Sequence, residues 1–168
     1  MSDFKIIGPV TFDQAIDETS TTQMAPLGMV IVLAEDQATT GYGVGEFIYL
    51  KGVASTLVGS FVTIADNQTT ALAVANGIGQ VAVAMSINVA SQFGWYQISG
   101  QAAGKVLASF ASAGSDAFLT ATAGSLDDAD VAGDFVLSAV PVSDIDTPSS
   151  GLAEFQLNRP SVSDGLDN

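Results

Sequence analysis

The chain has 168 residues, of which 4 are basic and 18 acidic, so its net charge is −14 and only 13% of its residues are charged. A surface of this sign repels nucleic acid and anionic lipid, so neither is expected as a partner. The chain contains no cysteine and no histidine, which excludes disulfides, thiolate metal sites and a histidine general base.

The charges are unevenly spread along the chain. Residues 1–36 carry six acids and one lysine, a net charge of −5, and residues 127–168 carry nine acids and one arginine, a net charge of −8. The central residues 37–126 carry three acids and two lysines, a net charge of −1. With 48% hydrophobic residues, we expect one domain with a buried core. The charge-poor residues 37–126 allow two interpretations. Their surface is either rich in Ser, Thr and Gln and in contact with water, or it is covered by partner subunits, because interface cores are depleted of charge.

The apolar character of the chain does not indicate a membrane protein. Residues 67–104 contain no charged side chain, but Asn, Gln, Ser, Thr and Gly interrupt them throughout. No window of about 18 consecutive apolar residues exists, so no transmembrane helix is expected. The chain also lacks a basic segment followed by an apolar run at its start, so we expect no signal peptide.

The first 26 residues are expected to form an N-terminal arm. The stretch "FKIIGPVTF" carries large apolar side chains without the regular alternation of a core strand, and Pro26 closes the segment. Such side chains are costly to leave in water, since burial of each is worth roughly 1.5–3 kcal/mol. We therefore expect the arm to dock on a partner through Phe4, Ile6, Ile7 and Phe12.

Residues 27–142 are predicted to be an all-β body, a single compact antiparallel β-barrel or sandwich with extended terminal arms. Apolar and polar residues alternate in short runs, and turn residues separate the runs at intervals typical of such folds. One stretch, "AAGKVLASFASAG", favours a helical turn instead, because Ala, Lys and Leu favour helix. The expected strands lie within residues 26–36, 45–53, 61–64, after the turn at Asp66 and Asn67, within 79–86, and near Phe118 and Phe135.

The central stretch "SQFGWYQISGQAAGKV" contains the only tryptophan of the chain. In a strand, Phe93 and Trp95 point to one face and Tyr96 to the other, so both faces are partly apolar. This pattern indicates a strand buried on both sides or one that faces a neighbouring subunit; a ligand-stacking platform made by Trp95 and Tyr96 is the alternative. A phosphate loop is not expected, because Val106 stands where the Ser or Thr after the lysine is required.

No catalytic signature is found, and we predict that the protein is not an enzyme and has no catalytic, cofactor-binding or metal-binding residues. The acidic pairs Asp17–Glu18 and Glu35–Asp36 consist of adjacent residues, which point apart in an extended chain. The stretch "DDADVAGD", residues 127–134, resembles a calcium loop that would start at Asp128. Counted from Asp128, the fifth position is Ala132 and the twelfth is Ala139, where a calcium loop needs a glutamate. Whether this acidic turn binds a cation in another way stays open.

Residues 143–168 are expected to form an acidic C-terminal arm or tail. They are rich in Ser, Asp and Pro and contain one apolar cluster of Leu152, Phe155 and Leu157. We expect Phe155 to contact a partner, as a competing anchor to the N-terminal arm.

The order of "PLGMVIVLAED", "GEFIYLKGVAST", "GSFVTIADNQTTAL", "GQVAVAMS" and "QFGWYQISGQA" resembles a family of head decoration (cement) proteins of tailed bacteriophages. The resemblance covers residues 27–142 and depends on the style of the strands and on "FGWYQISG". It implies a virion structural protein, made in the host cytoplasm, that binds the outer surface of the capsid as a homotrimer. The implied partners are the major capsid protein and other copies of the chain, and the implied role is to stabilise the head by bridging capsomers.

Two other classes of protein remain as alternatives. A carbohydrate-binding or adhesin module would use Trp95, Tyr96 and Tyr42 as stacking residues. A small hydrolase would use carboxylates such as Glu46 or Asp66. The candidate residues for a capsid or subunit interface are Phe4, Ile6, Ile7, Phe12, Phe93, Trp95, Tyr96 and Phe155.

Overall fold

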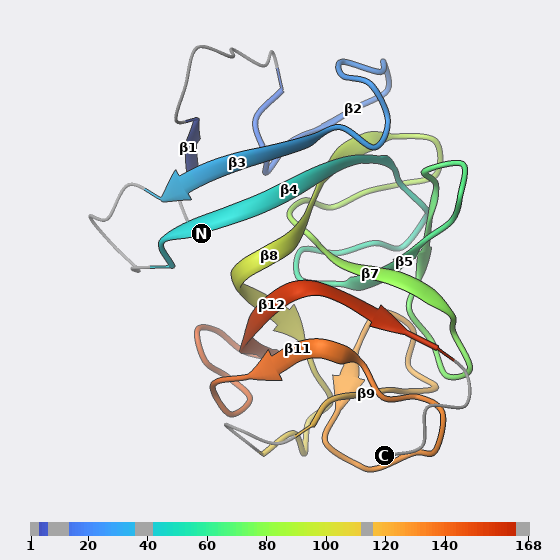
Figure 1. The fold of residues 1–168 in the computed structure, drawn as a ribbon, viewed down its shortest axis with the longest axis vertical. Coiled ribbons are helices and arrows are strands. Elements are labelled where there is room, and N and C mark those ends of the chain that lie inside the picture. The colour runs from blue at the N-terminus through green and yellow to red at the C-terminus, as the bar shows by residue number, and fades with distance from the viewer. Residues whose placement is uncertain (1–3, 7–13, 36–41, 112–115, 164–168) are drawn as a thin grey trace.

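The computed structural model describes residues 4–6, 14–35, 42–111 and 116–163, and within these ranges the protein is all-β, as predicted. Ten strands form one antiparallel sheet, which curls into half of a barrel (Figure 1). The strands of this sheet are β1 (Phe4–Ile6), β2 (Thr19–Ser20), β3 (Val30–Glu35), β4 (Val44–Lys51), β5 (Phe61–Ile64), β6 (Thr70–Leu72), β7 (Gly79–Ala84), β8 (Phe93–Lys105), β11 (Leu137–Pro141) and β12 (Leu152–Val162). A separate pair is formed by β9 (Phe118–Leu119) and β10 (Leu126–Asp127).

The main sheet is organised around β8, its longest strand. The first half of β8 pairs with β4 as far as Ser99, and the second half pairs with β12 from Ser99 to Lys105. Strand β7 pairs with β8 and also with the far end of β12. Figure 1 shows β3 and β4 in the upper part of the curled sheet and β11 and β12 in its lower part, with β8 running between them.

A glycine allows β8 to change partners. Gly100 has a φ of +93°, which residues with a side chain rarely adopt. A Cβ at this position would lie 2.5 Å from the carbonyl oxygen of Val44, so the backbone of β4 also approaches too closely for any side chain. On β4, the pairing with β8 shifts register between Glu46 and Phe47. Glycine at position 100 is therefore the residue that permits the bend in the sheet.

The core lies on both faces of the central strands. Trp95 packs with Phe47 and Tyr49 on one face, whereas Tyr96 packs with Ile48 on the other. A third and larger cluster fills the half-barrel around β12, β7 and the second half of β8. Of the two interpretations of this stretch, a strand buried on both sides is confirmed for residues 94–98, and this explains why β8 is apolar at consecutive positions there.

Most of the predicted strands of the body are present. The alternation in residues 45–53 and 79–86 corresponds to β4 and β7, and residues 61–64 form β5 with the bounds that the sequence predicts. The helical turn expected in residues 102–114 is wrong for residues 102–105, which continue β8 as a strand. Here pairing with β12 outweighs the helix preference of alanine and lysine, because tertiary contacts routinely override intrinsic propensity.

The terminal segments are more closely integrated than the sequence suggested. Strand β1 pairs with β3, and β2 pairs with β8. The side chain of Gln14 is buried and accepts a hydrogen bond from the Tyr49 hydroxyl, with an oxygen–oxygen distance of 2.7 Å. Strand β12, which the sequence placed in an acidic C-terminal arm, lies inside the sheet between β8 and β11. In the described residues these segments are therefore parts of the domain rather than extended arms.

No membrane-spanning helix is found in the described part of the chain.

We predict that Gly100→Ala lowers the free energy of unfolding by more than about 2 kcal/mol. A non-glycine residue at such a φ costs roughly 1–3 kcal/mol, and the contact with the Val44 oxygen adds to this cost. Gly43→Ala is the control, because Gly43 also has a positive φ of +74° but a Cβ there would meet nothing within 4 Å. Urea unfolding of both variants measures the difference, and equal losses would contradict the steric role of Gly100.

We also predict that Phe155→Ala lowers the free energy of unfolding by about 3–5 kcal/mol, as expected for an aromatic residue removed from a core. Phe155 is fully buried, and its ring centroid lies 5.1 Å from that of Phe61. The neighbouring Gln156 is exposed, so Gln156→Ala should change the stability by only about 0.5 kcal/mol or less. If both variants unfold at the same denaturant concentration as the original protein, β12 is not the core strand described here.

Candidate functional site

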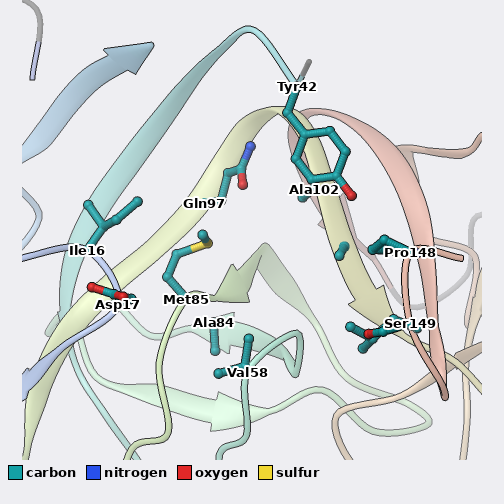
Figure 2. A pocket seen from close by; sticks show the side chains of 12 residues that line it. Ile16, Asp17, Tyr42, Val58, Ala84, Met85, Gln97, Ala102, Pro148 and Ser149 are labelled. Atoms are coloured by element: carbon teal, nitrogen blue, oxygen red, sulfur yellow. The ribbon is translucent and has the colours of Figure 1, made fainter. Parts of the chain in front are cut away.

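The candidate site is a surface formed by a pocket and by an adjoining apolar patch. The pocket lies between the segment Ile16–Asp17 and the segment Pro148–Ser149, which face each other across it in Figure 2, and Met85 and Gln97 lie between them. Its volume is about 200 Å³. The other lining residues, mostly apolar, are Tyr42, Val58, Ala84, Ala102, Ala103 and Leu152.

Polar groups of the pocket are fixed by hydrogen bonds. The Nε2 atom of Gln97 donates to the carbonyl oxygens of Ser99 at 3.1 Å and Gln101 at 2.9 Å. The Tyr42 hydroxyl donates to Oε1 of Glu154 at 2.8 Å, and Nε2 of Gln101 donates to Oε2 of the same carboxylate at 3.1 Å. These bonds hold the amide of Gln97 and the ring of Tyr42 in defined orientations beside an otherwise apolar surface.

The apolar patch consists of Leu57, Val58, Ile87 and Val89, which are all exposed. They belong to two loops, one after β4 and one between β7 and β8, joined by an antiparallel bridge between Thr56 and Asn88. Val58 also lines the pocket, so the patch adjoins the pocket at this residue. Exposed aliphatic side chains grouped in this way mark an interaction surface more often than scattered ones do.

Asn88 explains why the patch residues point outward. Its side chain is buried, and Nδ2 donates to the hydroxyl of Tyr96 at 3.0 Å. A Cβ at Gly94 would lie 2.7 Å from this nitrogen, so the absence of a side chain there leaves room for the amide. Because neighbouring residues of an extended segment point to opposite sides, Ile87 and Val89 are directed to the solvent.

Burial controls the ionisation of Tyr96. It raises the pKa of the Tyr96 hydroxyl to about 12 from the ordinary value of 10.0, and hydrogen bonds with Thr70 and Asn88 oppose this rise only in part. The hydroxyl is therefore a neutral hydrogen-bonding group at physiological pH, and its place in the core is structural.

The aromatic residues selected from the sequence lie mainly in the core. Trp95 and Tyr96 are both buried, on opposite faces of β8, so they do not form a stacking platform at the surface. Phe155 is buried as well. Phe93 is half-buried and stacks on Tyr49 at a distance of 6.4 Å between ring centroids. Of the aromatic residues considered for carbohydrate binding, Tyr42 alone lines the pocket.

The structure places the N-terminal candidates only in part. Phe4 and Ile6 are in β1, whose backbone pairs with β3. Ile7 and Phe12 lie outside the described residues. The proposed contact of this segment with a capsid therefore stays a prediction.

Two carboxylates of the acidic turn accept hydrogen bonds from backbone amides, whereas Oδ1 of Asp127 is buried without a hydrogen-bond partner in the described residues. An oxygen of Asp128 accepts a hydrogen bond from the Ala111 amide at 3.3 Å, and one of Asp134 accepts from the Asn76 amide at 2.6 Å. Burial raises the pKa of Asp127, and a hydrogen bond from the backbone of Asp128 opposes this rise. Within the described ranges, no group of three or more His, Cys, Asp or Glu residues is arranged to hold a metal ion.

The two carboxylates of the hydrolase alternative have different surroundings. Glu46 forms a salt bridge with Arg159, with 3.0 Å between nitrogen and oxygen. Asp66 is exposed in the turn between β5 and β6. Neither of them lines the pocket.

Neither the patch nor the pocket is predicted from the sequence. The stretch "SINVAS" did carry a signal, since Ile87 and Val89 alternate with the polar Asn88. Such a pattern does not tell which side faces the solvent, and here the polar residue is the buried one. The pocket is made from six separate parts of the chain, so no local pattern could reveal it.

No family model, no curated protein and no solved structure matches this chain.

We predict that Tyr96→Phe makes the protein less sensitive to alkaline pH. Because the pKa of Tyr96 is raised in the folded state, the stability linked to its proton is complete below about pH 10 and is lost as the pH rises through about 12. The two pKa units correspond to roughly 2–3 kcal/mol. Unfolding free energies at pH 9 and pH 11.5 should therefore differ less in the variant than in the original protein. Tyr42→Phe is the control and should keep the full difference; an unchanged difference in Tyr96→Phe would contradict the prediction.

Proposed function

We propose that the chain is a virion structural protein that binds the outer surface of a phage capsid as a homotrimer and stabilises the head by bridging capsomers. The observation that supports this most is the exposed apolar surface made by the patch and the pocket. The patch belongs to the central residues 37–126, whose net charge is only −1. The resemblance of residues 27–142 to head decoration proteins supplies the identity of the partner. In this proposal the protein has no catalytic role.

The exposed surface suits binding to other proteins. Leu57, Val58, Ile87 and Val89 remain partly in contact with water in the single chain, and their burial against a partner would be favourable by about 25 cal/mol for each Å² of apolar surface. Interface cores are apolar and poor in charge, and residues 37–126 share both properties. The hydrogen bond between Asn88 and Tyr96 keeps this surface in place before any partner arrives.

Binding as a trimer would increase the avidity for a shell. Each copy would present one apolar surface, and linking three of them converts later contacts into intramolecular ones. A protein that binds only the assembled shell also stabilises that shell, because binding lowers the free energy of the assembled state relative to the free subunits. A modest contact for each subunit is then sufficient for a stabilising role.

We predict that Ile87→Ser weakens assembly or binding to undecorated heads of the cognate phage by at least about tenfold, as expected when an aliphatic contact is lost. Ile78→Ser is a matched control, since Ile78 is 63% exposed and Ile87 60%, and Ile78 lies outside the patch. Light scattering gives the mass of each purified variant, and co-sedimentation with heads gives its binding.

The possible outcomes show which contact the patch makes and, separately, whether the protein has the proposed function. Loss of the trimer in Ile87→Ser places the patch between subunits, and loss of head binding with an intact trimer places it against the shell. If Ile87→Ser and Ile78→Ser behave alike, the patch is not an assembly surface. A chain with the original sequence that stays monomeric or does not bind heads contradicts the proposed function.

A further inference from the structure

The pocket beside the apolar patch has the chemistry of a site for a cation with an aliphatic stem. We propose that it binds a single arginine or lysine side chain carried by an extended segment of the capsid protein. This inference rests on the proposed function, because it names the chemistry by which the partner would be recognised. It goes further in assigning a specific pocket and one kind of side chain to that contact.

The size and walls of the pocket fit one long side chain. Its volume of about 200 Å³ is below the roughly 300–1,000 Å³ of pockets for small-molecule ligands. Val58, Met85 and Leu152 give it apolar walls. Lysine and arginine bury their methylene stems on such walls while the charged end stays near polar groups or water.

The polar atoms that Gln97 and Tyr42 offer to a ligand are acceptors. Both hydrogens of the Gln97 amide are directed to the carbonyl oxygens of Ser99 and Gln101, which fixes the amide with its Oε1 atom as the remaining polar group. Gln97 is only 1% exposed, and in the described part of the chain its Oε1 accepts no hydrogen bond. The Tyr42 hydroxyl already donates its hydrogen to Glu154. Lysine and arginine side chains carry donors and no acceptor, so they match this arrangement.

The charge of the pocket has the matching sign. Asp17 is the charged residue among those that line it, and its exposed carboxylate has no hydrogen bond or ion pair within the described ranges. The carboxylate of Glu154 lies next to the pocket through its bond with Tyr42. Lys105 pairs with Leu152 at one end of the pocket but is not among the lining residues. The net charge of −14 further favours a basic partner.

The test uses the purified protein with ¹³C-labelled methionine methyl groups and four blocked peptides, Gly-Gly-X-Gly-Gly, in which X is Arg, Lys, norleucine or Glu. The Met85 methyl group lines the pocket and reports binding, and the exposed Met24 serves as the internal reference. We expect the Arg and Lys peptides to shift the Met85 signal at lower concentration than the norleucine peptide, and the Glu peptide to bind most weakly.

Two variants test the role of the carboxylate. Asp17→Asn should weaken binding of the Arg peptide about two- to fivefold, which is the range for an exposed ion pair, and should leave the norleucine peptide unchanged. Asp66→Asn removes another exposed carboxylate and should change neither. The advantage of Arg over norleucine should shrink in 0.5 M salt, because salt screens exposed charges.

Several results would overturn the inference. They are the absence of a Met85 shift with any peptide, equal binding of norleucine and Arg, or equal effects of Asp17→Asn and Asp66→Asn. Binding to undecorated heads distinguishes this inference from the proposed function. If the original chain binds heads and Asp17→Asn binds them equally well, the function stands and the pocket inference fails. If the Arg peptide binds as expected but neither the original protein nor its variants bind heads, the proposed function fails. The inference that the pocket binds a basic side chain then still stands.

Discussion

The fold depends on a steric constraint at Gly100, where the central strand bends and changes partners. A residue with a side chain would meet the carbonyl oxygen of Val44 and would need a φ that it rarely adopts. Near this position the ladder with β4 on one edge of β8 ends and the ladder with β12 on the other edge begins, and Ser99 belongs to both. The sheet can then curl around the cluster that contains Phe155 and still bury Trp95 on its other face.

Burial of both faces of β4 and β8 determines where polar groups can be placed. The hydroxyl of Tyr49 donates to Gln14 and accepts from the amide of Met24, so the N-terminal segment is attached to the core by specific hydrogen bonds. This attachment brings Ile16 and Asp17 to the rim of the pocket. On the opposite face, Tyr96 holds Asn88 and thereby the loop that presents Ile87. Two buried tyrosines thus connect the core to the two sides of the candidate site.

The sequence was sufficient to predict the fold class and most strands, because alternation and turn residues are local signals. The apolar residues at consecutive positions 95 and 96 indicated either a strand buried on both faces or one that faces a neighbouring subunit, and residues 94–98 are buried on both faces. It did not predict the position of β12, since Ser, Asp and Pro around the strand resemble a tail, and only pairing with β8 and β11 reveals that Phe155 is in the core. The pocket was not predictable, because Asp17, Gln97 and Leu152 meet only through the tertiary fold. The patch had a local signal, but the burial of Asn88 depends on Tyr96 and on the space at Gly94.

The position of β12 inside the sheet affects how the chain folds while it is being synthesised. A ribosome releases residues 93–105 well before residues 152–162, so during synthesis the second half of β8 has an unpaired edge until its partner emerges. Pairing between segments so far apart in sequence is slow, and unpaired strand edges can join the edges of other chains. Nascent chains on neighbouring ribosomes are therefore the population most exposed to mispairing, and this exposure ends once β12 has been inserted.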